Sequence, residues 1–422
     1  MRSNSSNEPS GSINASIQAT SGWLFVLPWP LRQTGGVNQV VKSLVAQFLN
    51  GGVFSPKLLI ASGESEARGT NEPELTGQHH LDLGNLVDNR HPLRALGSFV
   101  YRFAHRYRAM RRIIDQNNIE IINPHFPDLG CLLFLILKKF KRFRGKIILS
   151  FHLSDIREAL TTKGLERKLW KVLLRGADHI VVVSDDLAAD VLALDSTIAA
   201  KITTIYNGVD LAMFAAAKHE QDAPFPVPNS GKTILSTGAF IPRKGHDVLV
   251  RAFGHILIKV PDARLILVGG DGPEFEPLQQ LIHSMALTNK VTLFKDVPHK
   301  RMPAFLSQAQ LFVLASRQEG HPLAVIEAGA AGLPVICSRT VGLSGLITHG
   351  VTGRLVEIGN EQALAEAMID LLTRPEEAQR LAATFHEYVK NNLTWERTYE
   401  KYLRLASDSV SHEVLVAESH EQ

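Results

Sequence analysis

LFVLASRQEGHPLAVIEAGAAGLPVICS, residues 311–338, is the stretch whose pattern decides the class of fold. The apolar run Leu311–Leu314 predicts a strand, Pro322–Ala331 predicts a helix, and Pro334–Cys337 predicts a second strand. Both strands are apolar along their whole length, which is typical of parallel strands that are covered by helices on both faces. The stretch therefore predicts one strand–helix–strand unit of a doubly wound α/β sheet.

The same alternation continues along the chain in two series. The first series predicts strands at Leu24–Leu27, Lys57–Ala61, Glu120–Ile122, Lys146–Phe151, His179–Val183 and Ile202–Tyr206. The second series adds strands at Thr233–Ser236, Arg264–Val268 and Val291–Phe294, with helices around Val248–Ile256 and Pro277–Met285. Strands that alternate with helices in this way favour two Rossmann-like domains in tandem, with a deep cleft between them.

The boundaries of these domains follow from changes in the pattern. We expect the first domain at residues 21–214 and the second at residues 233–392. Residues 215–232 contain three prolines and no periodicity, and they predict a linker. Residues 1–20 are rich in Ser and Asn and lack a long apolar core, so we expect a flexible tail and not a signal peptide. Residues 408–422 predict a second flexible tail.

Composition restricts the class of protein. The 422 residues are 45% apolar and 21% charged, which is ordinary for a globular protein of two or three domains. The net charge of +3 is too small to indicate a nucleic-acid-binding protein. Cys131 and Cys337 lie in apolar runs without a neighbouring His or Cys, so we expect no metal site, no disulfide framework and a reducing, cytoplasmic setting.

Positive charge gathers in one region of the first domain. From Arg90 to Lys146 there are thirteen Lys and Arg residues against three Asp and Glu residues. Two interpretations stay open, a solvated face on two helices or a docking surface for anionic lipid or an anionic acceptor. Leu129–Leu137 is the most apolar candidate helix, but nine residues are too few to cross a bilayer. Any contact with a membrane is therefore expected to be peripheral.

Ligands of open α/β sheets bind beyond the carboxyl ends of the strands, so the loops there are the candidate sites. Gly35 and Gly36 precede the first helix, where a ligand can approach the backbone and its free amides, or where a tight turn alone requires glycine. His152 follows the strand that ends at Phe151, and it is either a structural hydrogen-bonding group or a catalytic one. Gly270 lies in the glycine-rich turn "GGDGPE", which is a weak sign of close backbone approach.

Charged residues flank two helices of the second domain. Arg243 and Lys244 precede a helix, and adjacent cations there oppose the helix dipole unless an anion such as a diphosphate compensates them. Glu319 precedes the helix that begins near Pro322, and Glu327 lies about a turn and a half inside it. Amides at Leu323 and Ala324 could hold a phosphate while both carboxylates bind hydroxyls, as a nucleotide sugar requires. A capping Glu plus an exposed Glu is the structural alternative.

Taken together, these motifs resemble the retaining glycosyltransferases of family 4, the glycosyl transferases group 1, which have the GT-B fold. The resemblance runs from about Leu24 to Leu405 in the expected order. It is carried by "TGGVNQVV", "SFHLSD", "IVVVSDDL", "IYNGVD", "RKGHDVLVRAF", "LVGGDGPE", "EGHPLAVIEAGAAGLPVICS", "GVTGRLV" and "LTWERTYEKY".

The resemblance implies a role for each candidate residue. Lys244 and Arg243 would neutralise the diphosphate, Glu327 would bind ribose hydroxyls, and Glu319 would lie against the transferred sugar. His152 would contact the sugar and help to position the acceptor. The donor-binding set would also include Gly36, Gly270, Gly320, His321, Pro322 and Leu323. The final helix, about residues 394–407, would cross back onto the first, acceptor-side domain, and Asn207 and Gly208 would lie near the hinge.

The resemblance also implies front-face transfer with retention of configuration, without a metal ion or other cofactor, from a nucleoside diphosphate sugar to a glycan or lipid-linked acceptor. Such an enzyme would build a cell-surface polysaccharide or glycolipid. Three positions depart from the pattern of the family: Ala239 stands where Arg is common, Gly345 stands at an acidic position, and His321 replaces a frequent Phe. A nucleotide-sugar epimerase on the same fold and a catalytically silent binding subunit stay open as alternatives, as do the donor base, the sugar and the acceptor.

Overall fold

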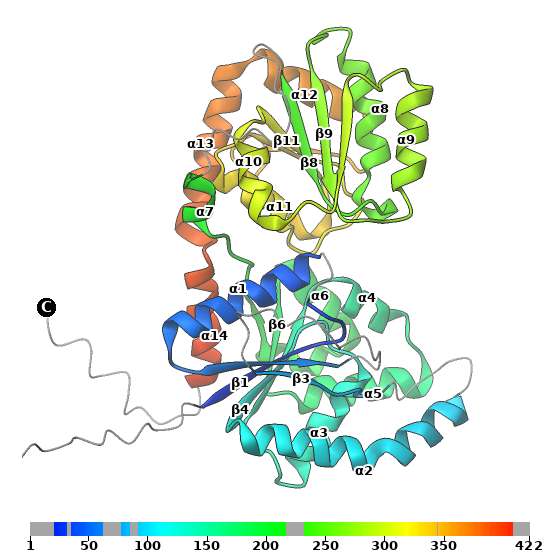
Figure 1. Cartoon of the computed structure of the whole chain (residues 1–422), viewed down its shortest axis with the longest axis vertical. Coiled ribbons are helices and arrows are strands. Elements are labelled where there is room, and N and C mark those ends of the chain that lie inside the picture. Colours follow the sequence, from blue (N-terminus) through cyan, green and yellow to red (C-terminus); the bar gives the residue numbers. More distant parts are fainter. Residues whose placement is uncertain are drawn as a thin grey trace, which may run out of the picture.

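A computed structural model describes residues 21–31, 35–61, 77–84, 92–216, 232–343 and 345–407. Two α/β domains lie one above the other along the long axis of the molecule (Figure 1). The predicted tails at residues 1–20 and 408–422, and most of the predicted linker, lie outside the described residues.

The first domain is built on a parallel sheet of seven strands in the order β3-β2-β1-β4-β5-β6-β7. The strands are β1 (Gly22–Leu27), β2 (Ser55–Ile60), β3 (Gln78–His80), β4 (Ile119–Pro124), β5 (Lys146–Phe151), β6 (His179–Val182) and β7 (Ile202–Thr204). The helices that accompany it are α1 (Gly36–Gly51), α2 (Pro92–Gln116), α3 (Leu132–Lys139), α4 (Ser154–Thr161), α5 (Gly164–Gly176), α6 (Asp185–Leu194) and, from the end of the chain, α14 (Trp395–Ser407).

The second domain has a parallel sheet of six strands in the order β10-β9-β8-β11-β12-β13. They are β8 (Thr233–Thr237), β9 (Arg264–Gly269), β10 (Val291–Lys295), β11 (Leu311–Leu314), β12 (Val335–Ser338) and β13 (Arg354–Val356). The helices are α7 (Leu211–Ala216), α8 (His246–Ile256), α9 (Phe275–Ser284), α10 (Met302–Ser307), α11 (Leu323–Ala330), α12 (Glu361–Thr373) and α13 (Pro375–Asn392). The predicted doubly wound fold is confirmed, while the three-residue edge strands β3 and β13 were too short to predict.

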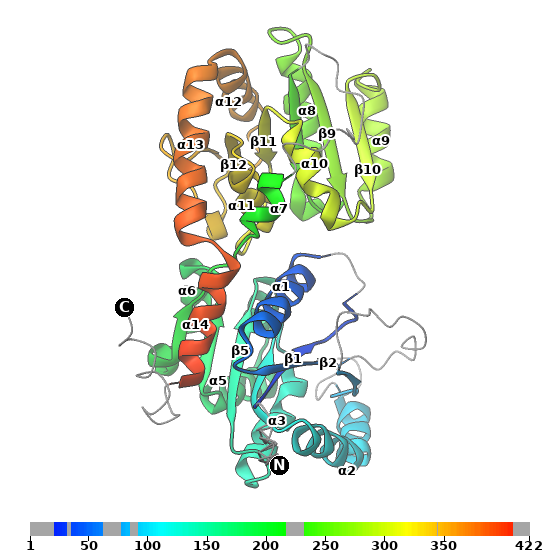
Figure 2. The ribbon, with the colours of Figure 1, turned by 60° about the vertical axis from the view of Figure 1, so that its left-hand side comes forward.

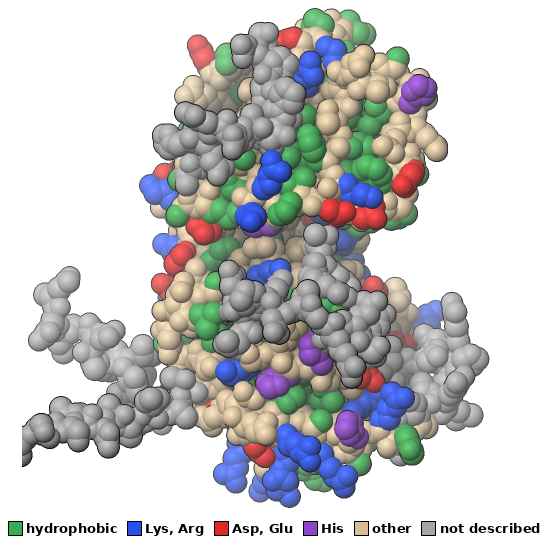
Figure 3. Space-filling model, viewed as in Figure 1, with side chains coloured by type: hydrophobic (Ala, Val, Ile, Leu, Met, Phe, Trp, Pro, Cys, Tyr) green, Lys and Arg blue, Asp and Glu red, His purple; other side chains and the backbone are tan. Residues whose placement is uncertain are grey.

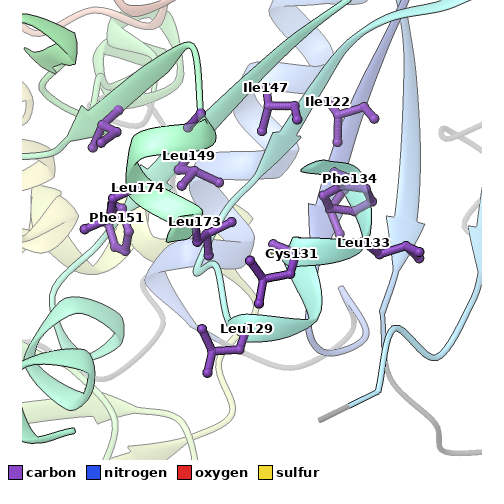
Figure 4. Packing of buried hydrophobic residues seen from close by; sticks show 14 of the residues in the cluster. Ile122, Leu129, Cys131, Leu133, Phe134, Ile147, Leu149, Phe151, Leu173 and Leu174 are labelled. Atoms are coloured by element: carbon purple, nitrogen blue, oxygen red, sulfur yellow. The ribbon is translucent and has the colours of Figure 1, made fainter. Parts of the chain in front are cut away.

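Alternation along a single strand shows why the first sheet is covered on both faces. Leu24 and Val26 of β1 belong to a core on one face, together with residues of α3 and α5. Their neighbours Trp23 and Phe25 belong to a core on the other face, with α1 and α14. Successive side chains of a strand point to opposite faces, so an apolar run buries both. Figure 4 shows the first of these cores, where α3 and α5 pack against β4 and β5.

The chain crosses twice between the domains, and the two crossings pair with each other. Val209 donates its N–H to the Leu393 carbonyl at 2.9 Å, and Thr398 Oγ1 donates to the Tyr206 carbonyl at 3.0 Å. After the second crossing, α14 lies against the first domain, below α13 (Figure 2). Lys146 Nζ donates to the carbonyl of Leu405 at the end of α14, at 2.6 Å. The predicted return of the last helix to the first domain is confirmed.

Gly208 makes this double crossing possible. A Cβ atom at this position would lie 2.4 Å from the Thr394 carbonyl carbon and from the Trp395 nitrogen, both of which are backbone atoms that cannot rotate away. We expect Gly208→Ala to lower the free energy of unfolding by about 1–3 kcal/mol, measured by denaturant titration.

Gly97 provides the matched control for that substitution. It lies within α2, and a Cβ atom there would meet no atom of the described residues within 4 Å. Gly97→Ala should leave stability unchanged or raise it by up to about 1 kcal/mol, since alanine is the better helix residue. Equal effects of the two substitutions would contradict the proposed packing role of Gly208.

Candidate active site

The carboxyl ends of the two sheets meet at a close backbone contact. Gly320 follows β11 of the second domain, and His152 follows β5 of the first domain. A Cβ atom at Gly320 would lie 2.1 Å from the His152 carbonyl oxygen, so this approach requires glycine. Charged side chains lie on both sides of the waist between the domains (Figure 3). The predicted residues Gly320 and His152 are therefore neighbours across the domain boundary.

Lys244 and Glu319 form an ion pair at this boundary. Lys244 Nζ lies 2.7 Å from Glu319 Oε1, and Ser316 Oγ donates to the same oxygen at 2.6 Å. The Glu319 side chain is only 7% exposed and that of Lys244 is 17% exposed. Both bonds use Oε1, and no described residue bonds Oε2. The carboxylate therefore keeps one oxygen with which it can accept hydrogen bonds from a ligand.

Arg243 differs from its neighbour. The predicted conflict between two cations and a helix dipole is relieved within the protein at Lys244, because Glu319 supplies the compensating charge. Among the described residues, the Arg243 guanidinium has no ion-pair partner, and its backbone carbonyl accepts from the Arg317 N–H at 2.8 Å. Both cations lie in a short 3-10 turn, Pro242–Lys244, just before α8. Arg243 is thus the cation at this turn that an external anion can pair.

The helix α11 begins one residue later than predicted, at Leu323, with Pro322 as its N-cap. No side chain caps this end, and no described residue accepts from the amides of Leu323 and Ala324. Leu323 also packs against apolar residues of both domains. Two free amides therefore lie four to five residues after Glu319, in a segment that touches both domains.

Glu327 lies apart from the Lys244–Glu319 pair and has its own partner. His299 Nε2 lies 2.7 Å from Glu327 Oε1, and Glu327 is largely buried. Burial lowers the pKa of His299, but the hydrogen bond and charge of Glu327 outweigh it and hold that pKa above the ordinary value. The pair borders a pocket of about 120 Å³ between the domains, which is also lined by Gln39, Ser43, Gln47, Gly208, Asp210 and Trp395.

His152 lies in a strained turn that a buried carboxylate holds in place. Leu153 has a φ of 153°, which a non-glycine residue rarely adopts. Asp155 accepts from the backbone N–H groups of His152, Leu153 and Ile156 at 2.8–2.9 Å. Burial raises the pKa of Asp155 to about 6, although these bonds oppose the rise. The turn fixes the backbone of His152 at the domain boundary.

His321 points toward the first domain. Its ring stacks on that of Tyr206 with centroids 5.0 Å apart, and its carbonyl accepts from Asn207 Nδ2 at 3.1 Å. Tyr206 in turn donates its hydroxyl to Asp185 at 2.8 Å. A Cβ atom at Gly345 would lie 3.2 Å from the Tyr206 hydroxyl oxygen. Burial lowers the pKa of His321 to about 3, so the ring is neutral. Two of the positions that depart from the family pattern, His321 and Gly345, thus adjoin one tyrosine.

The remaining predicted glycines have different surroundings. Gly36 is the first residue of α1, and a Cβ atom there would meet nothing within 4 Å in the part of the chain that the structure describes. Gly270 instead uses its carbonyl to accept from the Phe240 N–H at 3.0 Å. The neighbouring Gly269 has a structural reason to be glycine, because a Cβ atom would lie 2.0 Å from the Gly238 carbonyl oxygen. The turn "GGDGPE" therefore packs against the neighbouring loop.

Sequence reasoning missed several polar residues at this boundary. Asn123 and His125 lie at the end of β4, fully buried, and His125 Nδ1 lies 3.0 Å from His152 Nε2. Ser316 and His299, which bond the two glutamates, were not singled out either. The signal available for His125 was its place three residues after the strand predicted to end at Ile122, in a loop at the carboxyl edge of the sheet. Among the described residues, no cluster of three His, Cys, Asp or Glu side chains is placed to hold a metal ion.

The His299–Glu327 pair predicts a pH-dependent contribution to stability. Because the folded-state pKa of His299 is raised, the contribution is full below the ordinary value of 6.5 and is lost as pH rises through the raised value. We expect Glu327→Gln to lower Tm by about 1–2 °C at pH 6, and by less at pH 9. In a His299→Asn background the same substitution should show no such pH dependence. A Tm difference of constant size would contradict the coupling.

Two family models match consecutive parts of the chain. Residues 34–213 match a family described as Glycosyltransferase Family 4, and residues 217–387 match one described as Glycosyl transferases group 1. N-acetyl-alpha-D-glucosaminyl L-malate synthase of Bacillus anthracis is 27% identical over 69% of this chain and 76% of its own. A GDP-mannose-dependent alpha-(1-6)-phosphatidylinositol monomannoside mannosyltransferase of Mycobacterium tuberculosis is 27% identical over 68% of this chain and 75% of its own.

Solved structures share the arrangement of the two domains. Sucrose-phosphate synthase of Thermosynechococcus elongatus superposes with a TM-score of 0.72, at 22% identity, over 91% of this chain and 98% of its own. Anabaena HepE in complex with UDP also gives 0.72, at 16% identity, over 91% of this chain and 99% of its own. At these identities the similarity concerns the fold. Within the described residues, no helix combines the length and apolar character that crossing a bilayer requires.

Proposed function

We propose that this chain catalyses a specific sugar transfer. It is a glycosyltransferase of the GT-B fold, and its residues 34–213 and 217–387 match two glycosyltransferase families. It moves a sugar from a nucleoside diphosphate sugar to a glycan or lipid-linked acceptor, in the synthesis of a cell-surface polysaccharide or glycolipid. The names of its relatives support this proposal, since one is GDP-mannose-dependent and acts on a phosphatidylinositol mannoside. A solved structural neighbour contains UDP-glucose.

The observation that carries the proposal is the Lys244–Glu319 ion pair beside the uncapped N-terminus of α11. Arg243 and the free amides of α11 form a positive surface that suits a diphosphate, and Lys244, whose ion pair with Glu319 is partly exposed, can turn toward the same anion. The second oxygen of Glu319 is open to a hydroxyl of the transferred sugar. Glu327 takes the ribose hydroxyls, in exchange for its bond to His299. Each group of the donor thus meets a residue of suitable chemistry.

The proposed transfer retains the configuration of the anomeric carbon, as the resemblance to the family 4 glycosyltransferases implies. The acceptor oxygen bonds to the anomeric carbon on the face from which the diphosphate leaves, and its proton passes to the departing phosphate oxygen. The bond between the anomeric carbon and that phosphate oxygen breaks. Arg243, Lys244 and the α11 amides stabilise the negative charge that develops on the diphosphate, and stabilisation of this kind commonly contributes most to the rate acceleration of an enzyme. We propose that these groups do so without a metal ion.

Substitution of Glu319 tests the proposal. A thermal-shift panel of UDP-, GDP- and ADP-sugars first identifies the donor, since a ligand at 100 times its Kd stabilises by about 2.7 kcal/mol. Glu319→Gln keeps the shape of the side chain but loses its charge and its ion pair with Lys244. With this donor, we expect kcat/KM for sugar transfer to an acceptor to fall about 100-fold or more.

A matched control separates this effect from a change in net charge. Glu357 is 72% exposed and pairs with Arg339 at the surface. Glu357→Gln should leave kcat/KM unchanged. Transfer at the wild-type rate by Glu319→Gln would reject the site. Tight donor binding with no transfer by the wild-type protein would favour a silent binding subunit.

We further propose that one surface of the first domain docks on anionic membrane. Blue basic side chains gather at the foot of this domain, over α2 and the end of α3 (Figure 3). Several basic residues are structural, because Arg106 pairs with Asp82 and Lys138 with Asp178. The docking surface consists of exposed residues without an ion-pair partner among the described residues, joined by two exposed aromatic rings: Arg108, Arg112, Lys139, Lys141, Arg142, Arg144, Tyr101 and Phe140.

This surface suits the cytoplasmic leaflet, which carries anionic lipid. The free, buried thiols of Cys131 and Cys337 fit a reducing compartment, and they support the proposal that the enzyme works at that face.

Vesicle sedimentation tests the docking surface. Each basic residue near an anionic membrane contributes about 1 kcal/mol, so the triple substitution Lys141→Gln, Arg142→Gln and Arg144→Gln should weaken binding about 100-fold. Removal of three charges from the second domain, at Lys259, Arg339 and Lys390, is the control and should weaken binding far less. Equal binding to neutral and anionic vesicles would reject the docking surface.

A further inference from the structure

A chain of buried polar side chains runs through the core of the first domain to His152. Asn123, His125 and Ser150 are fully buried at the carboxyl ends of β4 and β5. Polar groups in such a position are costly unless each has a hydrogen-bond partner. The hydrogen-bond partners of these side chains determine how the Asn123 amide is oriented and which imidazole nitrogens carry a proton.

The orientation of the Asn123 amide is the first step. Its Nδ2 lies 2.8 Å from the Ile148 carbonyl oxygen and 2.9 Å from Ser150 Oγ. A backbone carbonyl only accepts, so the amide atom that faces it must be the nitrogen. Asn123 Oδ1 then faces His125 Nε2 at 3.1 Å. The amide therefore presents an acceptor to the imidazole.

The protonation of both imidazoles follows from that acceptor. His125 Nε2 must donate to Asn123 Oδ1, and in a neutral imidazole its Nδ1 is then an acceptor. His125 Nδ1 faces His152 Nε2 at 3.0 Å, so His152 Nε2 must carry the proton. Burial lowers the pKa of both histidines, that of His152 to about 4, which keeps the rings neutral. His152 Nδ1 is left as a bare lone pair.

That lone pair is available to a ligand. No described residue bonds His152 Nδ1, and His152 is only half-buried, in contrast to the fully buried His125. Asp155 fixes the backbone of His152 through two N–H groups, and Gly320 of the second domain lies against its carbonyl. The ring and the backbone of His152 are therefore held by independent sets of bonds at the domain boundary.

We propose that Asn123 and His125 are positioning residues that hold His152 as its Nε2–H tautomer, so that Nδ1 accepts a hydrogen bond from a hydroxyl in the cleft. The proposal rests on the proposed function for the source of that hydroxyl, the transferred sugar or the acceptor. A neutral acceptor suits this place, because it orients a hydroxyl without adding a positive charge beside the anomeric carbon, where positive charge develops as the diphosphate leaves.

The tautomer is measured directly by long-range ¹H–¹⁵N correlation of ¹⁵N-histidine-labelled protein without any ligand. Signals are assigned by their loss in His125→Gln and in His152→Asn. We expect both rings to be neutral, with the proton on Nε2. A proton on Nδ1 of His152 in the wild-type protein would overturn the proposal. This result does not depend on sugar transfer, so it stays separate from the test of the proposed function.

Asn123→Leu removes the acceptor that fixes the proton of His125 on Nε2 and thereby that of His152 on Nε2. We expect His152 to become a mixture of tautomers, and kcat/KM for transfer to fall about 10-fold, the equivalent of one hydrogen bond. Asn123→Asp keeps an acceptor toward His125 and, as the protonated acid, can also donate to the Ile148 carbonyl, so at a pH where this carboxyl is protonated it should restore the Nε2–H tautomer and most of the activity. Tyr402→Phe is the control, because it removes a buried hydroxyl that bonds Ser150 and neither histidine. An Asn123→Leu variant that keeps the wild-type tautomer and kcat/KM would overturn the proposal.

Donor hydrolysis in the absence of acceptor distinguishes the two sources of the hydroxyl. If the transferred sugar provides it, Asn123→Leu should slow hydrolysis and transfer by the same factor. If the acceptor provides it, hydrolysis should continue at the wild-type rate while transfer falls and the KM for the acceptor rises. Either result supports the positioning role. Unchanged rates of both reactions would reject it.

Discussion

The pairing of the two chain crossings at Gly208 and Thr394 is the constraint on which the rest of the structure depends. The chain leaves the first domain beside the segment by which it returns, and the backbones touch because Gly208 has no side chain. Val209 bonds Leu393 across this contact at 2.9 Å. Two crossings in contact act as one short connection, so the carboxyl ends of both sheets stay directed toward each other. An isolated linker of Pro-rich sequence would not impose that restriction.

The two domains supply different kinds of chemistry to the boundary that this connection creates. The second domain contributes the charged groups Arg243, Lys244 and Glu319, whereas the first contributes His152, which burial keeps neutral. Under the proposed function, this division has an electrostatic reason. A diphosphate needs cations, and these have to lie with the leaving group. A cation beside the anomeric carbon would instead oppose the positive charge that develops there. A desolvated imidazole provides hydrogen bonding without that repulsion.

Most of the fold could be predicted from sequence, because strands that are buried on both faces are continuous apolar runs. The site could be predicted only in part. Glu319 and Lys244 were placed in the same cleft by their positions after parallel strands. Their ion pair was not predictable, because 75 residues separate them and the pattern gives no distance. Asn123 was missed because β4 was expected to end at Ile122, whereas it continues to Pro124. A polar residue inside an extended strand is hard to distinguish from one in a loop.

The segment from Glu319 to Leu323 carries both site groups and the backbone contacts that hold the two domains together. Gly320 touches the His152 carbonyl from one side, and Gly342 packs on Gly320 from the other, where a Cβ atom would lie 2.1 Å from the Gly320 oxygen. The Glu319 carbonyl accepts from the Gly342 N–H at 3.1 Å. The backbone that carries the carboxylate and the free amides of α11 is thus confined on both sides. The Gly320–His152 contact joins this segment to the first domain, so the position of His152 relative to Glu319 and the α11 amides depends on how closely the two domains approach.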